Sequence, residues 1–422
     1  MKTSTSKRLR WNVAIWLAAG LFMTSTAGMA SGPIMPDPKA EARHQPQVEE
    51  TANGIPLVNI TAPSSGGVSR NEYETFNVPD KGAILNNSYT LSKTELAGYV
   101  QGNNNMAERP AKIIVNEVTG AGPTSMDGFL EVAGNRADVV IANPNGITVN
   151  GGGFINTGKA FLTTGKPVYD GEDHLQRFDI TGGDILIEGK GLGGKETGSL
   201  AILSRAVKIN AGIWAKDLHI TTGANTVDAK TLEASAIEGK GGRPAFALDT
   251  AAIGGMYAGR ITLVGTEKGL GVNNSGTWSA EDNLTLDWNG DLKNSGTIYS
   301  KGNTDLRASR LENDKTIAAE RNLSAAAKEN IHNQGKLLAG ENMGIYAGKT
   351  LDNAGHAMES RNNLSIETGD AINNAAGTIK SGGSQQIKAG HTLTNTEGTL
   401  AADRNINIQT DKMTGDGIVS AG

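Results

Sequence analysis

Residues 274–303 read NSGTWSAEDNLTLDWNGDLKNSGTIYSKGN, and the opening Asn274-Ser275-Gly276-Thr277 returns as Asn294-Ser295-Gly296-Thr297. The leading asparagine then continues at spacings of 19 to 21 residues, at Asn313, Asn333, Asn353, Asn374 and Asn395. A second row recurs half a period later, at Asn283, Asn303, Asn322, Asn342, Asn363 and Asn405, with Gln385 in the missing slot. Two rows at one period of about 20 residues indicate an internal repeat in the last third of the chain.

The segments between these asparagines have the length and composition of β-strands. Apolar residues alternate after the second asparagine, as in Leu284-Thr285-Leu286, and β-branched runs such as Asp184-Ile185-Leu186-Ile187 occur earlier in the chain. Sustained helical periodicity is nearly absent, and Ser324 to Asn330 is the best local candidate for a helix.

A period near 20 residues, built from strands without the leucine framework of leucine-rich repeats, predicts a parallel β-helix. Each strand would pair with its equivalent in the next coil, and the rest of the coil would supply the long crossover that parallel strands need. Inward positions would stack Leu, Ile, Val and Ala. An asparagine at a turn can adopt left-handed geometry and bond to the matching asparagine one coil on. The repeated asparagines are therefore explained first as structure.

The composition agrees with a repeat protein. The chain of 422 residues contains 56 glycines and only 5% aromatic residues, which suits the stacking of small side chains better than a compact α/β enzyme. The net charge of −5 argues against nucleic acid as a partner, since no basic excess is present. The sequence has no cysteine, so packing and hydrogen bonds alone must hold the fold.

The first 30 residues have the organisation of a Sec-type signal peptide. A basic start is followed by an apolar run from Trp11 to Met23 and by small residues, with cleavage expected after Ala30 or after Ala27. The alternative, a membrane anchor, would need roughly 20 apolar residues, and this run is shorter. Residues 31–53 are polar and proline-bearing, which predicts a flexible leader without a fold of its own.

Residues 54–271 resemble the secretion domain of two-partner-secretion exoproteins (TpsA), which include filamentous-haemagglutinin-like adhesins and contact-dependent growth inhibition toxins of the CdiA type. Residues 272–422 are similar to the haemagglutinin repeats of the same proteins. The resemblance is carried by Gly54-Ile55-Pro56-Leu57-Val58-Asn59-Ile60, Asn116-Glu117-Val118, Ala142-Asn143-Pro144-Asn145-Gly146-Ile147, Gly153-Phe154-Ile155-Asn156-Thr157, Ser204-Arg205-Ala206-Val207 and Gly254-Gly255-Met256-Tyr257-Ala258-Gly259.

This resemblance implies a right-handed parallel β-helix with extra-helical hairpins or loops and an N-terminal β cap. It also implies a route and partners. The Sec machinery would deliver the chain to the periplasm, and an outer-membrane TpsB-type barrel with POTRA domains would recognise the N-terminal domain and export the chain to the cell surface or medium. A receptor on a host or neighbouring cell would be the final partner, with no nucleic acid involved.

Two motifs are associated with secretion in this family, NPNG and an upstream NPNL. The first is intact as Asn143-Pro144-Asn145-Gly146, and the second appears as Asn103-Asn104-Asn105-Met106. Asparagine can still form the turn that proline would preset, and methionine approximates leucine in volume. These eight residues are the predicted sites of partner recognition. Some relatives carry a cysteine pair near NPNG, but this sequence has Val149-Asn150-Gly151-Gly152-Gly153 there.

Other motifs are weak, and the sequence predicts no catalytic, cofactor or metal site. Residues 189–195, GKGLGGK, match the start of a P-loop, but Glu196 replaces the required Ser or Thr, so a Gly-rich loop leaving the solenoid is expected. The six histidines lack metal-ligand spacing. Glu172-Asp173-His174 could be acid/base machinery, but a solvated turn between Tyr169 and Phe178 is the preferred interpretation.

Two readings of the function follow. The first is the secretion and stalk portion of an exported exoprotein that serves adhesion or toxin delivery, with no chemistry in this portion. The alternative is a secreted polysaccharide-acting β-helix enzyme of the lyase type, which would need charged groups clustered on one face of successive coils. The outward positions here vary in charge from coil to coil. Since Asp416 to Gly422 falls within a repeat and solenoids need caps, a longer protein is also expected.

Overall fold

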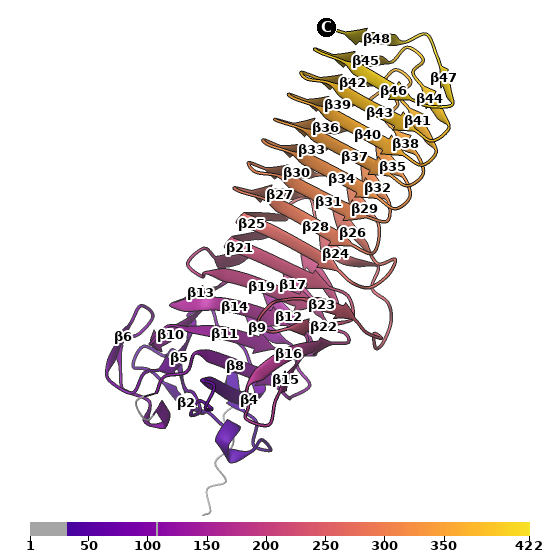
Figure 1. Ribbon diagram of the computed structural model, residues 1–422. Coiled ribbons are helices and arrows are strands. Elements are labelled where there is room, and N and C mark those ends of the chain that lie inside the picture. Colours follow the sequence, from indigo (N-terminus) through magenta and orange to yellow (C-terminus); the bar gives the residue numbers. More distant parts are fainter. Residues whose placement is uncertain (1–31, 107–108) are drawn as a thin grey trace, which may run out of the picture. The chain divides into compact units, whose positions relative to one another are not determined.

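A computed structural model of the protein describes residues 32–106 and 109–422, so the predicted signal peptide and its cleavage at Ala30 lie outside the described residues. Pro33–Gly422 form one unit. Within this unit the chain winds into a parallel β-solenoid in which three strands per coil stack into three ladders (Figure 1). The predicted all-β fold and the pairing of each strand with its equivalent one coil on are confirmed.

Ladder 1 contains the strand that opens each coil. Its members are β3 (Pro56–Asn59), β5 (Ala83–Asn87), β10 (Phe129–Gly134), β13 (Gly152–Ile155), β18 (Leu192–Gly194), the first halves of β21 (Gly212–Thr222) and β25 (Gly255–Gly265), β27 (Thr277–Ala280), β30 (Thr297–Ser300), β33 (Thr316–Ala319), β36 (Lys336–Ala339), β39 (Ala357–Ser360), β42 (Thr378–Ser381), β45 (Thr399–Ala402) and β48 (Ile418–Ala421).

Ladder 2 contains the next strand of each coil and also includes the second halves of β21 and β25. Its other members are β4 (Val68–Phe76), β8 (Ile113–Val118), β11 (Ala137–Ala142), β14 (Thr157–Thr163), β19 (Ser199–Ser204), β28 (Leu284–Trp288), β31 (Thr304–Ala308), β34 (Leu323–Ala327), β37 (Met343–Ala347), β40 (Leu364–Thr368), β43 (Gln385–Ala389) and β46 (Ile406–Gln409).

Ladder 3 closes each coil as a separate sheet. Its members are β9 (Thr124–Met126), β12 (Ile147–Val149), β17 (Asp184–Ile187), β20 (Ala206–Ile209), β24 (Phe246–Thr250), β26 (Gly271–Asn274), β29 (Leu292–Asn294), β32 (Leu311–Asn313), β35 (Ile331–Asn333), β38 (Leu351–Asp352), β41 (Ala371–Asn373), β44 (Thr392–Thr394) and β47 (Lys412–Thr414).

The remaining elements lie outside the coils. β6 and β7 form a hairpin beside ladder 1, and β15, β16, β22 and β23 form a four-stranded antiparallel sheet that packs on ladder 2. Their bounds, with those of the N-terminal elements, are β1 (Ile34–Pro36), η1 (Ala42–His44), β2 (Gln47–Glu50), β6 (Ser92–Thr94), β7 (Gly98–Val100), η2 (Asn104–Met106), β15 (Lys166–Tyr169), β16 (Leu175–Ile180), β22 (Asn225–Asp228) and β23 (Ala234–Ala236).

The segment predicted as a flexible leader, residues 31–53, differs from that expectation in the structure. β1 pairs antiparallel with β4, β2 pairs antiparallel with β3, and His44 between them is buried. The first coil offers an unpaired strand edge, and these short strands cover it because an open edge leaves its backbone groups without partners. The expected N-terminal β cap is therefore present, and the leader supplies it.

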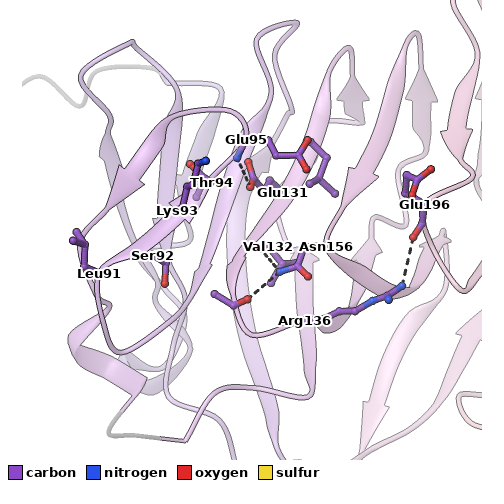
Figure 2. A pocket seen from close by; sticks show the side chains of 12 residues that line it. Leu91, Ser92, Lys93, Thr94, Glu95, Glu131, Val132, Arg136, Asn156 and Glu196 are labelled. Carbon is purple, nitrogen blue, oxygen red and sulfur yellow. Dashed lines mark hydrogen bonds between the residues drawn. The ribbon is translucent and has the colours of Figure 1, made fainter.

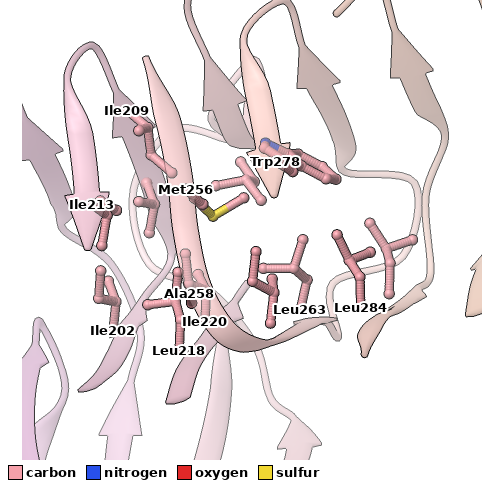
Figure 3. Close-up of a cluster of buried hydrophobic side chains, with 14 of the residues drawn as sticks. Ile202, Ile209, Ile213, Leu218, Ile220, Met256, Ala258, Leu263, Trp278 and Leu284 are labelled. Carbon is pink, nitrogen blue, oxygen red and sulfur yellow. The ribbon is translucent and has the colours of Figure 1, made fainter. Parts of the chain in front are cut away.

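The inward side chains form one continuous apolar core along the coils (Figure 3). Leucine and isoleucine stack in columns, as Leu286 pairs in register with Leu306. Trp278 and Trp288 are buried in this core, and their indole N–H groups donate to Thr250 Oγ1 at 3.0 Å and to Leu270 O at 2.7 Å. The core thus explains why a chain with few aromatic residues can bury a long hydrophobic interior.

The asparagines that end ladder 3 form the predicted amide ladder. Each side chain from Asn274 to Asn374 donates from Nδ2 to Oδ1 of the next asparagine at 2.7–2.8 Å, and the whole row is buried. The second row is partly exposed and bonds less regularly, as Asn322 Nδ2 donates to Asn303 Oδ1 at 2.9 Å.

The assignment of Gln385 to the second row is wrong. Ser384, not Gln385, occupies the slot beside Asn363, because the Ser384 N–H donates to Asn363 Oδ1. Gln385 instead lies in the inward column between Leu364 and Ile406, where its Nε2 donates to Ile379 O at 3.1 Å. Two further expectations also differ: residues 323–327 form β34 rather than a helix, and Leu192–Gly194 form β18 within ladder 1 rather than a loop leaving the solenoid.

Candidate functional site

The NPNG motif forms the corner between β11 in ladder 2 and β12 in ladder 3. The Gly146 N–H donates to Asn143 O at 3.1 Å, which closes a four-residue turn, and Gly146 has φ +111°, a conformation that favours glycine. Asn143 Oδ1 accepts the Asn145 N–H at 2.9 Å. The short asparagine side chain thereby fixes the turn from inside, as Asx turns do.

Asn143 is fully buried and connects this corner to the previous coil. Its Nδ2 donates to Gly122 O and to Thr124 Oγ1, both at 3.0 Å. Asn145 Nδ2 reaches the same neighbouring loop and donates to Gly120 O at 2.8 Å. Pro144 makes the outer face of the turn and is exposed. The motif therefore has a buried bonding face and a small exposed face.

The NNNM motif forms a similar corner between β7 and β8, just before the second strand of ladder 2. Asn103 is buried, its Oδ1 accepts the Asn105 N–H at 3.0 Å, and its Nδ2 donates to Ile60 O at 2.8 Å and Asn86 O at 3.0 Å. The Met106 N–H donates to Asn103 O at 3.1 Å, and Asn105 Nδ2 also reaches Ile60 O. Asn104 is exposed in the place of Pro144.

The fourth position differs between the two corners. Met106 buries its side chain in the core, whereas a Cβ atom at Gly146 would lie 3.1 Å from Asp184 O and would be strained by the φ of +111°. The structure places the two motifs at separate corners and does not bring them into one site. They share a local design in which the first asparagine holds the corner and the second residue faces solvent.

A pocket of about 1100 Å³ lies between the β6–β7 hairpin and the coils (Figure 2). Sequence reasoning did not single out Glu131, whose carboxylate accepts the backbone N–H groups of Glu95 at 2.7 Å and Leu96 at 2.9 Å and so ties the hairpin to β10. Burial raises the pKa of the Glu131 carboxyl, and these two hydrogen bonds oppose the rise. Arg136 on the same side donates to Thr157 O at 2.7 Å.

The residues Glu172, Asp173 and His174 form the tip of the β15–β16 hairpin, as the preferred interpretation placed them. Asp173 Oδ2 lies 2.8 Å from Arg43 Nη1 and 3.8 Å from His44 Nε2, so this turn fastens to the N-terminal cap. His44 Nδ1 also lies 3.1 Å from Glu72 Oε1. The cluster joins the tip of the β15–β16 hairpin to the N-terminal cap.

Within the part of the chain that the structure describes, no three His, Asp or Glu side chains converge as a metal ion would require. Along the repeats, charges of opposite sign pair between successive coils, with Lys293–Glu312 at 3.6 Å, Lys349–Glu329 at 3.4 Å and Lys388–Glu367 at 2.8 Å. Among residues 32–106 and 109–422, no helix has the length and apolar character needed to cross a membrane.

Comparisons with known proteins match this architecture. The family model described as TPS secretion domain covers residues 33–298, more than half of the chain. The chain belongs to the TPS secretion domain family. The model of the haemagglutinin repeat covers residues 299–397 and 381–420, so secretion domain and repeats follow each other along the chain. The matched secretion domain begins at residue 33, within the segment that the structure shows as the cap, whereas residues 54–271 were expected from the sequence.

Relatives of the TPS secretion domain and of its repeats include very long proteins. The chain is 42% identical over 298 residues to "Toxin CdiA" of Yersinia pestis, covering 65% of this chain and 9% of the relative. It is 38% identical over 340 residues to "16S rRNA endonuclease CdiA" of Enterobacter cloacae, covering 79% of this chain and 10% of the relative. The chain therefore spans about a tenth of the length of these curated relatives.

The crystal structure of the filamentous haemagglutinin secretion domain is similar at a TM-score of 0.56 and 31% identity. The match covers 72% of this chain and 97% of that structure. A TPS secretion domain implies a TpsB-type transporter, and the exoproteins that carry it are exported. The lyase alternative is not favoured by these findings.

Proposed function

We propose that this chain is the secretion and stalk portion of an exported exoprotein. A TpsB-type outer-membrane barrel with POTRA domains recognises the secretion domain after Sec-dependent transfer to the periplasm, and the chain then emerges at the cell surface or in the medium. The observation that carries the proposal is the match of residues 33–298 to the TPS secretion domain. The two asparagine corners, Asn103 to Met106 and Asn143 to Gly146, are the proposed recognition sites.

The geometry supports a role for both motifs in forming the first coils. Each buried asparagine bonds to backbone oxygens of the preceding coil, so the corner is completed only when that coil is in place. A solenoid grows by adding units to an existing neighbour, so a chain that emerges from a pore can fold coil upon coil. The sequence has no cysteine, so no disulfide would obstruct passage of the unfolded chain.

The function of the whole protein is proposed from its relatives. Their printed names include a toxin and a 16S rRNA endonuclease, and the chain covers only 9% and 10% of the length of these two relatives. We propose that any nuclease activity of the whole protein resides in a part other than these 422 residues. We infer that the haemagglutinin repeats form a stalk that presents either an adhesive or a toxin-bearing region to a receptor on another cell. No enzymatic step is assigned to the residues 32–422 themselves.

The test compares three alanine variants in cells that carry the chain and its barrel transporter. Asn143→Ala removes the buried bonds, Pro144→Ala changes only the exposed face, and Asn395→Ala is a matched buried asparagine in the repeats. The amount of protein in the medium is measured against the periplasm. We expect Asn143→Ala to lower release strongly and Asn395→Ala to leave initiation of export intact.

The Pro144→Ala variant separates two modes of recognition. Normal release indicates that the transporter needs the corner formed, and lost release indicates contact with the exposed turn. Deletion of the barrel gene is the control for the route. Unchanged release in the absence of the barrel would refute the proposed function.

A further inference from the structure

Four asparagines of the chain are followed directly by glycine, and they are Asn53, Asn145, Asn150 and Asn289. In this dipeptide an asparagine side chain reacts most readily with its own backbone. The backbone nitrogen of the following residue attacks the side-chain amide carbon, and a glycine leaves that nitrogen uncrowded. A nitrogen already engaged in a hydrogen bond attacks poorly, so the fold determines which of the four asparagines can react.

In three of the four pairs the glycine N–H donates to a backbone oxygen. The donors and acceptors are Gly54 with Thr51 O at 2.9 Å, Gly146 with Asn143 O at 3.1 Å, and Gly151 with Gly191 O at 2.9 Å. Each of these nitrogens must break its hydrogen bond before it can attack. Among residues 32–106 and 109–422, the Gly290 N–H has no hydrogen-bond acceptor. The pair Asn289-Gly290 therefore differs from the other three.

The backbone of Asn289 is fixed, while its side chain is exposed. The Asn289 N–H donates to Gly265 O at 3.0 Å, and Asn289 O accepts the Gly269 N–H at 2.7 Å. A hydrogen bond to the oxygen of a peptide unit draws electron density from the nitrogen of that unit and makes its N–H more acidic. The Gly290 N–H belongs to this peptide unit, so the loss of its proton is favoured.

A lysine from two coils further along the solenoid binds the side-chain oxygen of Asn289, which follows β28, whereas Lys328 follows β34. Lys328 Nζ donates to Asn289 Oδ1 at 3.0 Å, and Asn289 Nδ2 donates to Thr266 O at 3.3 Å. Attack on the amide carbon moves negative charge onto Oδ1, and an ammonium group beside this oxygen stabilises that charge. The site thus combines an available nitrogen with a cation where charge develops.

We propose that Asn289 deamidates in the folded protein, with Gly290 as the nucleophile and Lys328 as the stabilising cation. The Gly290 nitrogen loses its proton to water and bonds to Asn289 Cγ. The Cγ–Nδ2 bond then breaks, and the leaving nitrogen takes a proton from water and departs as ammonia. Water opens the resulting cyclic imide at either carbonyl carbon, which gives aspartate or isoaspartate. The net reaction consumes water and releases ammonia, and it does not depend on the transporter proposal.

Packing of the coil favours aspartate over isoaspartate at this position. Isoaspartate inserts an additional carbon into the main chain just before Gly290. A Cβ atom at Gly290 would lie 2.1 Å from Leu270 O and 2.6 Å from Leu270 C, so this loop is packed too closely to lengthen freely. Aspartate keeps the main chain unchanged and places a carboxylate oxygen beside Lys328, where Oδ1 of Asn289 now lies.

The test follows deamidation of the purified full chain by peptide mass spectrometry at all four asparagines. One sample stays folded in a mildly alkaline buffer, and the other is unfolded in guanidinium chloride. In the folded chain, Asn289 should deamidate at least about tenfold faster than Asn53, Asn145 and Asn150. In the unfolded chain the four rates should be similar. Chromatography of the product peptides should show a larger share of aspartate from the folded sample than from the unfolded one.

Lys328→Met keeps the length of the side chain and removes its charge, so deamidation of Asn289 in the folded chain should slow by about tenfold. Lys349→Met is the matched control, because Lys349 is the exposed lysine one coil on and its Nζ lies 3.4 Å from Glu329 Oε2. That variant should deamidate at the original rate. Equal rates at the four asparagines of the folded chain, or an unchanged rate at Asn289 in Lys328→Met, would overturn the proposal.

Discussion

Replacing Asn313 by alanine removes an inner member of the buried asparagine row. Its Nδ2 donates to Asn333 Oδ1 at 2.7 Å and to Lys336 O at 3.2 Å, and its Oδ1 accepts from Asn294 Nδ2 at 2.8 Å. Each lost bond costs about 1 kcal/mol, and a buried polar group left without a partner costs roughly 1–3 kcal/mol. We expect a loss of about 3–5 kcal/mol of local stability at ladder 3.

Asn322→Ala is the control from the same sequence repeat, nine residues further on. Asn322 also bonds to its neighbours, with Nδ2 2.9 Å from Asn303 Oδ1, but it is partly exposed. Water can take the place of the lost partner there, so the expected loss is within about 1 kcal/mol. The two variants delete the same amide from the same repeat and differ in burial.

Hydrogen exchange can measure the loss of stability of the two variants at the coils around the substituted asparagine. A solenoid opens locally, so a single unfolding midpoint would average over many coils. Backbone amides of residues 311–339 should exchange about a hundredfold or more faster in Asn313→Ala, and only slightly faster in Asn322→Ala. Equal effects of the two substitutions, or a small effect of Asn313→Ala, would refute the reasoning that burial makes this row essential.

Two further predictions concern ionisable groups. Burial lowers the pKa of His219 to about 4 from its ordinary 6.5, so the unfolded chain takes up this proton first as pH falls. Stability should therefore decline between pH 6.5 and 4, by about 3 kcal/mol at most, and denaturant titrations of His219→Gln should lack that part of the decline. If the two pH profiles are parallel, His219 is not the titrating group. Glu131→Ala removes the acceptor of two backbone N–H groups in the β6–β7 hairpin. Backbone amides of residues 92–100 should therefore exchange at least about tenfold faster, while those of β11 stay unchanged. Unaltered exchange in the hairpin would mean that other contacts hold it in place.

Local pattern was sufficient for the repeats because each coil has the same environment as its neighbours. Asn274, Asn294 and Asn313 recur at one spacing, and the same inward column and the same corner follow each of them. The failure at Gln385 shows the limit of this reasoning. We assigned this polar residue to the second asparagine row because of its spacing in the sequence. The register between β40 and β43 instead aligns it with Leu364 in the inward column.

Residues 324–330 show how stacking overrides local preference. Ala325, Ala326 and Ala327 favour a helix by propensity, yet they form β34 because β31 and β37 provide a backbone ladder on both sides. Pairing with neighbouring strands also determines the structure of the N-terminal cap. Residues 34–50 look unstructured by composition, and they are ordered because the first coil has strand edges to cover.

The period of the coil, its corner asparagines and its short strands could be predicted from the sequence, since these features repeat locally. That each coil has three strands, and which positions become neighbours across coils, follows only from the folded arrangement. Glu131 reaches Glu95 and Leu96 only because a hairpin folds back over β10. Phe129, Trp214 and Tyr257 share one face although 128 residues separate the first from the last. Extra-helical insertions change the spacing between coils in this region, so register, not periodicity, brings these side chains together.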